Sequence, residues 1–278
     1  MKNWKDYQGH KPEILGKRNK YDNTIYTFDI ETTSYYILND KIFIGSEYLN
    51  LSEEDKKEAI FMSNMYIWQL GINDQVYYGR TFEELYNFFK KIEILGTSCK
   101  KFCFVHNLSF EFQFLRNAFL FKKVFARKSR HVMKFELEEF NFEFRCTLYM
   151  TNAKLEQLHE LYNLNTEKLT GYLDYNKGIR NSLTKLSEEE LKYCENDCLV
   201  VYELIKQKIE EYGNIKSIPL TLTGIVRKEF REKTINNWSY KNYTRKSINI
   251  NPHVYNLLVS AFSGRLYTFF MDLYSEEL

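Results

Sequence analysis

The sequence predicts a mixed α/β fold in which helices pack on a central sheet. Two observations favour this class. Strand-like alternation and helix-like spacing of apolar residues follow each other along the chain, and no internal repeat or low-complexity tract interrupts them. The 278 residues suffice for a large buried core, and 17% of them are aromatic.

In the amino-terminal half, strands precede one clear helix. A polar leader runs to about residue 20, and the first strand is expected at 24–30. Residues 33–58 lack a steady period and are expected to form an inserted loop or small excursion. Strands at 60–71 and 75–79 are expected to flank a turn, and Thr81 to cap the helix that follows.

The carboxy-terminal half continues the pattern. Strands are expected at 101–106, 131–135 and 142–148, with helices at 110–118 and 153–164. Ser187 and Glu190 form a capping box at the start of a long helix that ends near Gly213. We therefore divide the chain into a leader (1–20), an α/β domain (21–213) and a basic segment (214–278) that is either a second small unit or the start of a larger domain.

Composition narrows the function classes. A net charge of +2 excludes binding of polyanions by bulk charge, so nucleic-acid contacts must come from local patches. The densest patch, which is either a solvated face or a strand-binding surface, contains Lys122, Lys123, Arg127, Lys128, Arg130, His131 and Lys134. The five cysteines lack zinc-site spacing, and neither a signal region nor a membrane-length apolar segment is found. We expect a cytoplasmic, reduced protein with no membrane partner.

Asp29 and Glu31 end the first expected strand. Because side chains alternate along a strand, both carboxylates leave one face while Phe28 and Ile30 enter the other. With no Lys or Arg between Asn23 and Lys41, the two carboxylates repel each other unless a cation lies between them. Magnesium prefers such oxygen ligands. The alternative is a charged sheet rim without a ligand.

Two further acidic positions can be assigned to elements. Glu111 lies where a strand gives way to a helix, and Tyr193 and Asp197 lie four residues apart on one face of the long helix. A solvated helix face is the alternative for the latter pair. Four carboxylates could hold two magnesium or manganese ions about 3.5 to 4 Å apart, with Tyr193 orienting the attacking water for phosphodiester hydrolysis. These four are Asp29, Glu31, Glu111 and Asp197.

The order of these residues resembles the three exonuclease motifs of family B DNA polymerases, most closely the protein-primed enzymes of bacteriophages. The first motif, Asp-x-Glu-Thr, corresponds to residues 29–32. The second is an Asn followed by an aromatic residue and an Asp, and corresponds to Asn107, Phe110 and Glu111. The third, Tyr-x-x-x-Asp, corresponds to Tyr193 and Asp197. The resemblance extends over about residues 27–209.

The resemblance implies a ribonuclease H-like exonuclease fold and further site residues. Lys168 falls where the protein-primed group carries a lysine that helps to stabilise the reacting phosphate. His106 precedes the Asn of the second motif as it does there. Other positions correspond to contacts with the last nucleotides of a single strand, although a core role is the alternative for the two phenylalanines: Thr32, Asn107, Phe110, Phe114, Thr147, Leu148 and Tyr175.

The chain departs from the family pattern in two ways. Glu111 replaces the usual Asp, and its additional methylene is expected to alter metal affinity or rate, or to silence the site. Up to Leu278 there is no polymerisation motif, and Ser263-Gly264-Arg265 matches the Tyr-x-Gly-Gly stretch between the two domains poorly. We therefore expect the exonuclease part of such a polymerase, as a fragment, a split gene product or an engineered piece.

The resemblance implies 3′-to-5′ removal of nucleotides from single-stranded DNA ends with two Mg²⁺ or Mn²⁺ ions, which in the parent enzyme proofreads copied DNA. The implied partners are DNA, the polymerase domain of the same enzyme and a terminal protein primer, in the host cytoplasm if the chain is viral. Two alternatives are a non-catalytic single-stranded nucleic-acid binding module and a standalone RNA-trimming nuclease of the same fold.

Overall fold

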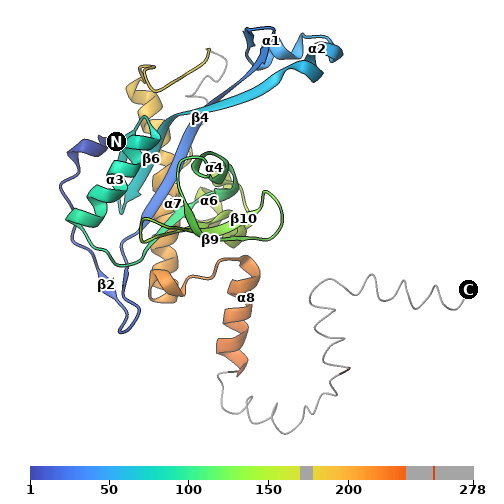
Figure 1. The fold of residues 1–278 in the computed structure, drawn as a ribbon. Helices are drawn as coiled ribbons and strands as arrows, with labels where there is room; N and C mark the ends of the chain where they lie inside the picture. Colours follow the sequence, from blue (N-terminus) through green and yellow to red (C-terminus); the bar gives the residue numbers. More distant parts are fainter. Residues whose placement is uncertain (170–177, 236–252, 254–278) are drawn as a thin grey trace, which may run out of the picture. The chain divides into compact units, whose positions relative to one another are not determined.

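The structure, a computed structural model, describes residues 1–169, 178–235 and 253 (Figure 1). The chain divides into two units, Met1–Ile225 and Val226–Leu278. Tyr175, Ser263-Gly264-Arg265 and much of the basic segment lie outside the described residues. None of the described helices is both long enough and apolar enough to cross a membrane.

Most strands belong to one mixed sheet, in the order β1-β7-β6-β4-β8-β11-β10-β9, with β5 paired to β4. The strands are β1 (Lys2–Asn3), β2 (Ile14–Leu15), β3 (Tyr21–Asp22), β4 (Tyr26–Leu38), β5 (Lys41–Phe43), β6 (Ile60–Ile72), β7 (Gln75–Gly79), β8 (Lys101–Val105), β9 (Phe121–Ala126), β10 (Val132–Leu137) and β11 (Phe142–Cys146). The central strands β4, β8 and β11 run parallel, whereas β6 lies antiparallel to β4.

Helices cover both faces of this sheet, so the predicted mixed α/β class is confirmed (Figure 1). The helices are α1 (Gly45–Leu49), α2 (Glu53–Glu58), α3 (Phe82–Leu95), α4 (Leu108–Leu115), α5 (Leu148–Thr151), α6 (Leu158–Tyr162), α7 (Glu188–Tyr212) and α8 (Leu222–Phe230), with short 3-10 helices η1 (Trp4–Asp6), η2 (Leu155–Gln157) and η3 (Ile215–Ser217) and the π-helical turn η4 (Arg231–Ile235). The capping boxes expected at Thr81 and Ser187 are present at the starts of α3 and α7.

The two faces of β4 contact different cores. Tyr26, Phe28 and Ile30 pack in the same cluster as the apolar face of α3. Their neighbours in sequence therefore face the other side of the sheet, where α7 lies. A second cluster there joins α7 to β8 through residues that include Phe102, Phe104 and Val201.

Residues 33–58 are ordered into an arm, so the predicted end of the first strand at residue 30 was wrong. β4 continues to Leu38 and pairs with the first half of β6, and α1 and α2 lie at the far end of this ribbon (Figure 1). Tyr36 stacks on Tyr48 with a ring distance of 3.5 Å. Aromatic and β-branched residues stabilise such a two-stranded ribbon even where their spacing is irregular.

Two other segments differ from expectation. β1, within the expected leader, pairs with β7, and Tyr7 is 1% exposed. The helix expected at 153–164 is divided into η2 and α6, and Asn163 at its end has a positive φ of 50°. Asn tolerates this left-handed conformation and so ends the helix early.

Candidate metal centre

A bulge in the sheet lies next to the first acidic pair. Asp29 pairs with Gln69 and Glu31 with Ile67, but Thr32 pairs with Met65, so Tyr66 is the additional residue on β6. Bulges bend a strand and change the direction of nearby side chains. Tyr66 and Ile67 are both buried, in a cluster that also contains Tyr193 of α7. The bulge therefore anchors α7 beside the two carboxylates.

α7 supplies the third motif. Tyr193 and Asp197 are one turn apart and buried, at 7% and 5% exposure. The same face continues through Cys198, Val201 and other apolar side chains that pack on the sheet. A carboxylate at the edge of such a stripe is held close to the β4 acids by the packing around it.

Three of the four predicted carboxylates come together. One oxygen of each of Asp29, Glu31 and Asp197 lies within 4.8 Å of the others. Burial raises the pKa of Asp29 well above its usual range, and the charges of Asp197, Glu31 and Glu111 raise it further. Burial also raises the pKa of Asp197, against the opposing effect of Lys168. The negative charge of the three carboxylates is therefore not balanced by Lys168 alone.

Glu111 faces the same site from the first turn of α4, but lies outside the 4.8 Å group. It is 3% exposed, and burial raises its pKa, with the charge of Glu31 adding to the effect. Its interactions with Asp29 and Glu31 place it beside the cluster. The structure therefore brings the fourth acid near the other three, without joining it to them as closely.

Lys168 supplies a cation to the cluster. Its Nζ donates a hydrogen bond to Asp197 Oδ2 over 3.0 Å and lies 5.6 Å from the centre of the Tyr193 ring. Burial alone would lower the pKa of Lys168, but the charges of Asp197, Tyr193 and Asp29 raise it instead. Lys168 is therefore charged at neutral pH.

The donor set fits divalent metal ions. Among the described residues, Asp197 Oδ1 and Glu111 Oε2 are buried and have no hydrogen-bond partner. A buried carboxylate oxygen without a partner is costly unless a cation binds it. All the groups here are hard oxygen donors, the kind that magnesium and manganese select. The buried acidic cluster can therefore hold a metal ion.

The residues expected to contact a nucleic-acid strand lie around the carboxyl end of β8. His106 Nδ1 lies 3.0 Å from Thr147 Oγ1, and burial and the charge of Lys168 lower the pKa of His106 to about 4. Asn107 caps α4 in the left-handed conformation with φ of 65°. Phe110 is 42% exposed, and its ring lies 5.3 Å from that of Phe114.

The other expected strand contacts have varied surroundings. Thr147 is buried and Leu148 is half-buried beside it at the start of α5, whereas Thr32 is half-buried on β4 after the bulge. Tyr175 lies outside the described residues. One residue was missed by the sequence analysis: Gln69 is fully buried and pairs with Asp29 across the strands. The signal in the sequence that could have identified Gln69 is a polar residue within the apolar second half of β6.

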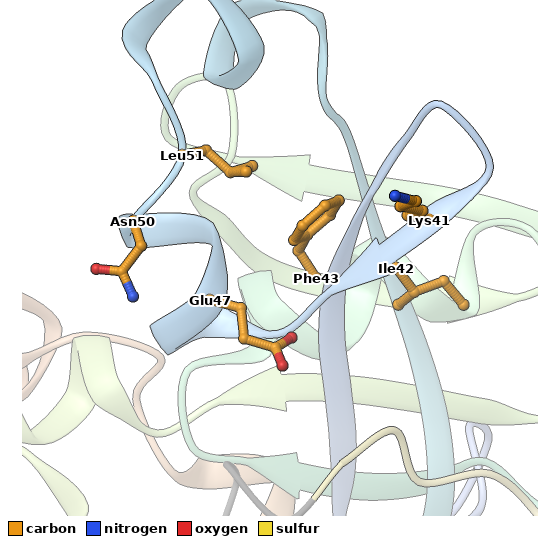
Figure 2. A pocket seen from close by; sticks show the side chains of 6 residues that line it. All are labelled: Lys41, Ile42, Phe43, Glu47, Asn50 and Leu51. Atoms are coloured by element: carbon orange, nitrogen blue, oxygen red, sulfur yellow. The ribbon is translucent and has the colours of Figure 1, made fainter.

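A pocket of about 640 Å³ lies away from this cluster, in the arm (Figure 2). Its lining comes from β5, α1 and the residues that follow α1, and includes Phe43, Glu47 and Leu51. Glu31 and Leu38 are seven residues apart on β4, which corresponds to about 23 Å along an extended strand. The pocket is therefore separate from the carboxylates.

Comparisons with known proteins concern the fold. No protein-family model and no curated protein matches this chain. Phi29 DNA polymerase complexed with single-stranded DNA matches it with a TM-score of 0.55 and 15% identity over 78% of this chain and 36% of that one. The same polymerase complexed with primer-template DNA and incoming nucleotides gives a TM-score of 0.52, with 15% identity over 78% and 35%.

At this identity the likeness shows a shared fold. The mixed sheet with helices on both faces is the ribonuclease H-like α/β fold that the sequence predicted. The chain spans about a third of the length of the polymerase structures that it resembles.

Proposed function

We propose that the chain is a metal-dependent 3′-to-5′ exonuclease that hydrolyses the last phosphodiester bond of single-stranded DNA. The observation that carries the proposal is the convergence of Asp29, Glu31 and Asp197, with one oxygen of each within 4.8 Å of the others. These acids lie far apart in the sequence and come from β4 and α7. Carboxylates that repel one another are rarely gathered in one buried cluster unless a function requires them.

Two Mg²⁺ or Mn²⁺ ions held by Asp29, Glu31, Glu111 and Asp197 would stabilise the attacking and leaving oxygens of an in-line displacement. Asp197 is suited to a ligand role because Lys168 engages only Oδ2 and leaves Oδ1 available. Glu111 likewise has a buried Oε2 without a partner among the described residues. Each acid therefore offers at least one oxygen.

Lys168 and Tyr193 serve as positioning groups in this proposal. Lys168 fixes the orientation of Asp197 through its hydrogen bond and adds a positive charge near the place where negative charge would develop on the phosphate in the transition state. The Tyr193 ring lies beside the Lys168 ammonium on the buried face of α7, so its hydroxyl can orient the attacking water.

The 3′ end would bind near the carboxyl end of β8. The exposed Phe110 ring offers a stacking surface for an unpaired base, and Phe114 supports it from the next turn. His106 is neutral at physiological pH and, with Thr147, offers hydrogen-bonding groups. Thr32, Asn107 and Leu148 complete the proposed strand contacts, and Tyr175 is proposed from the sequence alone. In a parent polymerase the activity would proofread, with the polymerase domain and a terminal protein as further partners.

The test is degradation of 5′-labelled single-stranded DNA with Mg²⁺ or Mn²⁺. We expect a ladder that shortens from the 3′ end, no product with Asp29→Ala, and normal products with Asp74→Ala. Asp74 is a matched control because it is an exposed acid in the β6–β7 turn. The proposal is contradicted if the Asp29→Ala variant still shortens the DNA. It is also contradicted if the unmodified chain does not shorten it. An RNA substrate in the same assay measures the preference between DNA and RNA.

One observation favours a second candidate, a binding module without turnover. Glu111 lies outside the 4.8 Å group, so a second metal ion would lack the close set of ligands that the first has. A module of this kind would retard labelled DNA in a gel without shortening it. The degradation assay and a gel-shift measurement on the same samples separate the two functions.

A further inference from the structure

A second polar site lies on the side of the sheet that α7 contacts, on other strands. Phe102 of β8, Glu143 and Arg145 of β11 and Lys134 of β10 line a cavity of about 600 Å³. Phe102 pairs with Glu143, and Arg145 pairs with Lys134, so these side chains share one face of the sheet. Tyr21 and η3 form part of the wall. Pockets of about 300 to 1,000 Å³ are typical of ligand sites.

The lining carries more positive than negative charge. It contains the single carboxylate of Glu143 and five cations, which are Lys20, Lys100, Lys134, Arg145 and Lys216. Glu143 is contacted by Lys100 at 2.6 Å, Arg145 at 2.8 Å and Lys134 at 3.5 Å. The carboxylate of Glu143 is therefore shared by three cations, and the neighbouring Glu136 contacts Lys100 at 3.2 Å.

Two of the cations have no acidic partner among the residues that the structure describes. Within the described residues, no carboxylate lies within 4.0 Å of Lys20 or Lys216, and Lys216 Nζ lies instead 5.5 Å from the centre of the Tyr21 ring. Both lysines are exposed at the cavity. Like charges gathered at one opening repel each other, and a bound anion relieves that repulsion. The cavity therefore carries a net positive charge that a bound anion would balance.

Arg145 is held as a donor toward an anion. Its guanidinium carbon lies 4.1 Å from the centre of the Phe102 ring, and its Nε donates to Glu143 Oε1. In the described part of the chain, its two terminal nitrogens donate no hydrogen bond to a protein acceptor. A planar guanidinium fixed by an aromatic ring on one face binds phosphate oxygens with little loss of entropy.

We propose that this cavity is a phosphate-binding site, distinct from the acidic cluster, that takes a phosphodiester of a nucleic-acid strand or the phosphate of a free nucleotide. The shared chemistry is a tetrahedral anion bound by Arg145 together with Lys20 and Lys216. A strand held here would be anchored away from the carboxylates, and its phosphates would meet cations instead of acids. The site does not depend on metal ions or on hydrolysis.

The test measures binding by the full chain in EDTA, which removes metal ions from the acidic cluster and prevents cleavage. The pocket variant is Lys20→Ala/Lys216→Ala, since neither lysine has a carboxylate partner to leave unpaired. The matched control is Lys41→Ala/Lys57→Ala, which removes the same charge from exposed lysines of the arm. Circular dichroism and thermal melting verify that both variants are folded.

Three probes are titrated: labelled single-stranded DNA by fluorescence anisotropy, and thymidine monophosphate and inorganic phosphate by NMR or calorimetry. We expect the pocket variant to bind the strand about 10-fold more weakly at 0.1 M salt, with the slope of log affinity against log salt smaller by about 1.4, and the control to change less than about twofold. Loss of mononucleotide or phosphate binding in the pocket variant alone, with strand binding intact, assigns the site to a free nucleotide. Equal behaviour of the two variants toward all three probes overturns the proposal, whatever the nuclease assay shows.

Discussion

Lys168 Nζ lies 3.0 Å from Asp197 Oδ2, and this ion pair links a loop before α7 to the buried face of that helix. The pair is asymmetric, because Asp197 Oδ1 is buried and has no partner among the described residues. One oxygen is therefore fixed by the protein, and the other is available to a ligand beside Asp29 and Glu31. A carboxylate held in this way is oriented before any ligand binds.

Replacing Lys168 tests whether this orientation matters for catalysis. Lys168→Met keeps the length of the side chain but removes its charge and hydrogen bond, and we expect kcat to fall about 100-fold while KM for DNA changes only a few fold. Lys168→Arg is expected to recover part of the loss. The measurement is steady-state hydrolysis of single-stranded DNA at saturating Mg²⁺. A loss seen only in KM would assign Lys168 to substrate binding instead.

Asp29→Asn is expected to abolish hydrolysis and at the same time to stabilise the metal-free protein. The pKa of Asp29 is raised by burial and by the charges of Asp197, Glu31 and Glu111. At pH values above the usual pKa of Asp, about 3.9, and up to the raised one, the folded chain binds more protons than the unfolded chain, so stability falls as pH increases through this window. The Asp29→Asn substitution removes this pH-dependent loss of stability, because Asn does not ionise.

The expected gain in the free energy of unfolding is about 1 to 2 kcal/mol at pH 7 in EDTA, and it should approach zero at about pH 2.5, where Asp29 is protonated in both states. Urea titrations at the two pH values measure it. Adding Mg²⁺ should stabilise the parent chain more than the variant, because metal bound only to the folded state raises stability. A variant that is less stable than the parent at pH 7 in EDTA would show that no charge repulsion exists there.

Glu111 tests how far the additional methylene matters. Glu111→Gln removes the charge while keeping the shape, and we expect a loss of at least about 100-fold in kcat, because the group would no longer bind a cation. Glu111→Asp is expected to stay within about 10-fold of the parent, since it restores the residue of the related motif. Single-turnover hydrolysis over a range of Mn²⁺ concentrations separates metal affinity from rate. Equal rates for the Gln variant and the parent would remove Glu111 from the site.

Much of the fold followed from local patterns. The capping boxes at Thr81 and Ser187 mark the starts of α3 and α7, and the alternation of Phe28 and Ile30 with Asp29 and Glu31 fixed which face of β4 meets which core. These signals depend on residues close together in the sequence. The placement of Asp197 beside Asp29 required distant residues, and was predicted only because motif order resembled a known family.

Other features depend on contacts that a local pattern does not contain. The arm forms because residues 33–38 of β4 pair with β6 across a long excursion, and its stacked pair, Tyr36 and Tyr48, comes from two different elements. The register also places part of the expected basic patch. Lys123 of β9 pairs with Glu136 and so lies on the same face of the sheet as Lys134, which pairs with Arg145. Register between strands, which local sequence does not specify, decides which cations share a face.

Phe110→Ala is expected to weaken single-stranded DNA binding about 10-fold, because one base would lose its stacking surface. The ring is 42% exposed, so the effect on the free energy of unfolding should stay below about 1 kcal/mol. Phe61→Ala is a matched control, since Phe61 is 57% exposed in the arm. Fluorescence anisotropy in EDTA gives the affinities. If both variants weaken binding equally, or neither does, Phe110 is not a base platform.

Glu143 offers a prediction on pH that is independent of metal ions. Burial alone would raise its pKa, but the charge of Arg145 and hydrogen bonds from Lys100 and Arg145 overcome that effect and lower it to about 2. A lowered pKa means that the group stabilises the fold at pH values above its usual pKa of about 4.3, and that this contribution is lost as pH falls toward 2.

The Glu143→Gln variant should therefore be less stable than the parent chain by about 3 kcal/mol at pH 7, because Arg145 loses its buried partner. The difference from the parent chain should shrink steadily between about pH 4.5 and 2.5, because the unfolded parent chain binds a proton at Glu143 in this range while the folded chain does not. Chemical unfolding across this range checks the sign, and a difference that grows on acidification would contradict the ion-pair assignment.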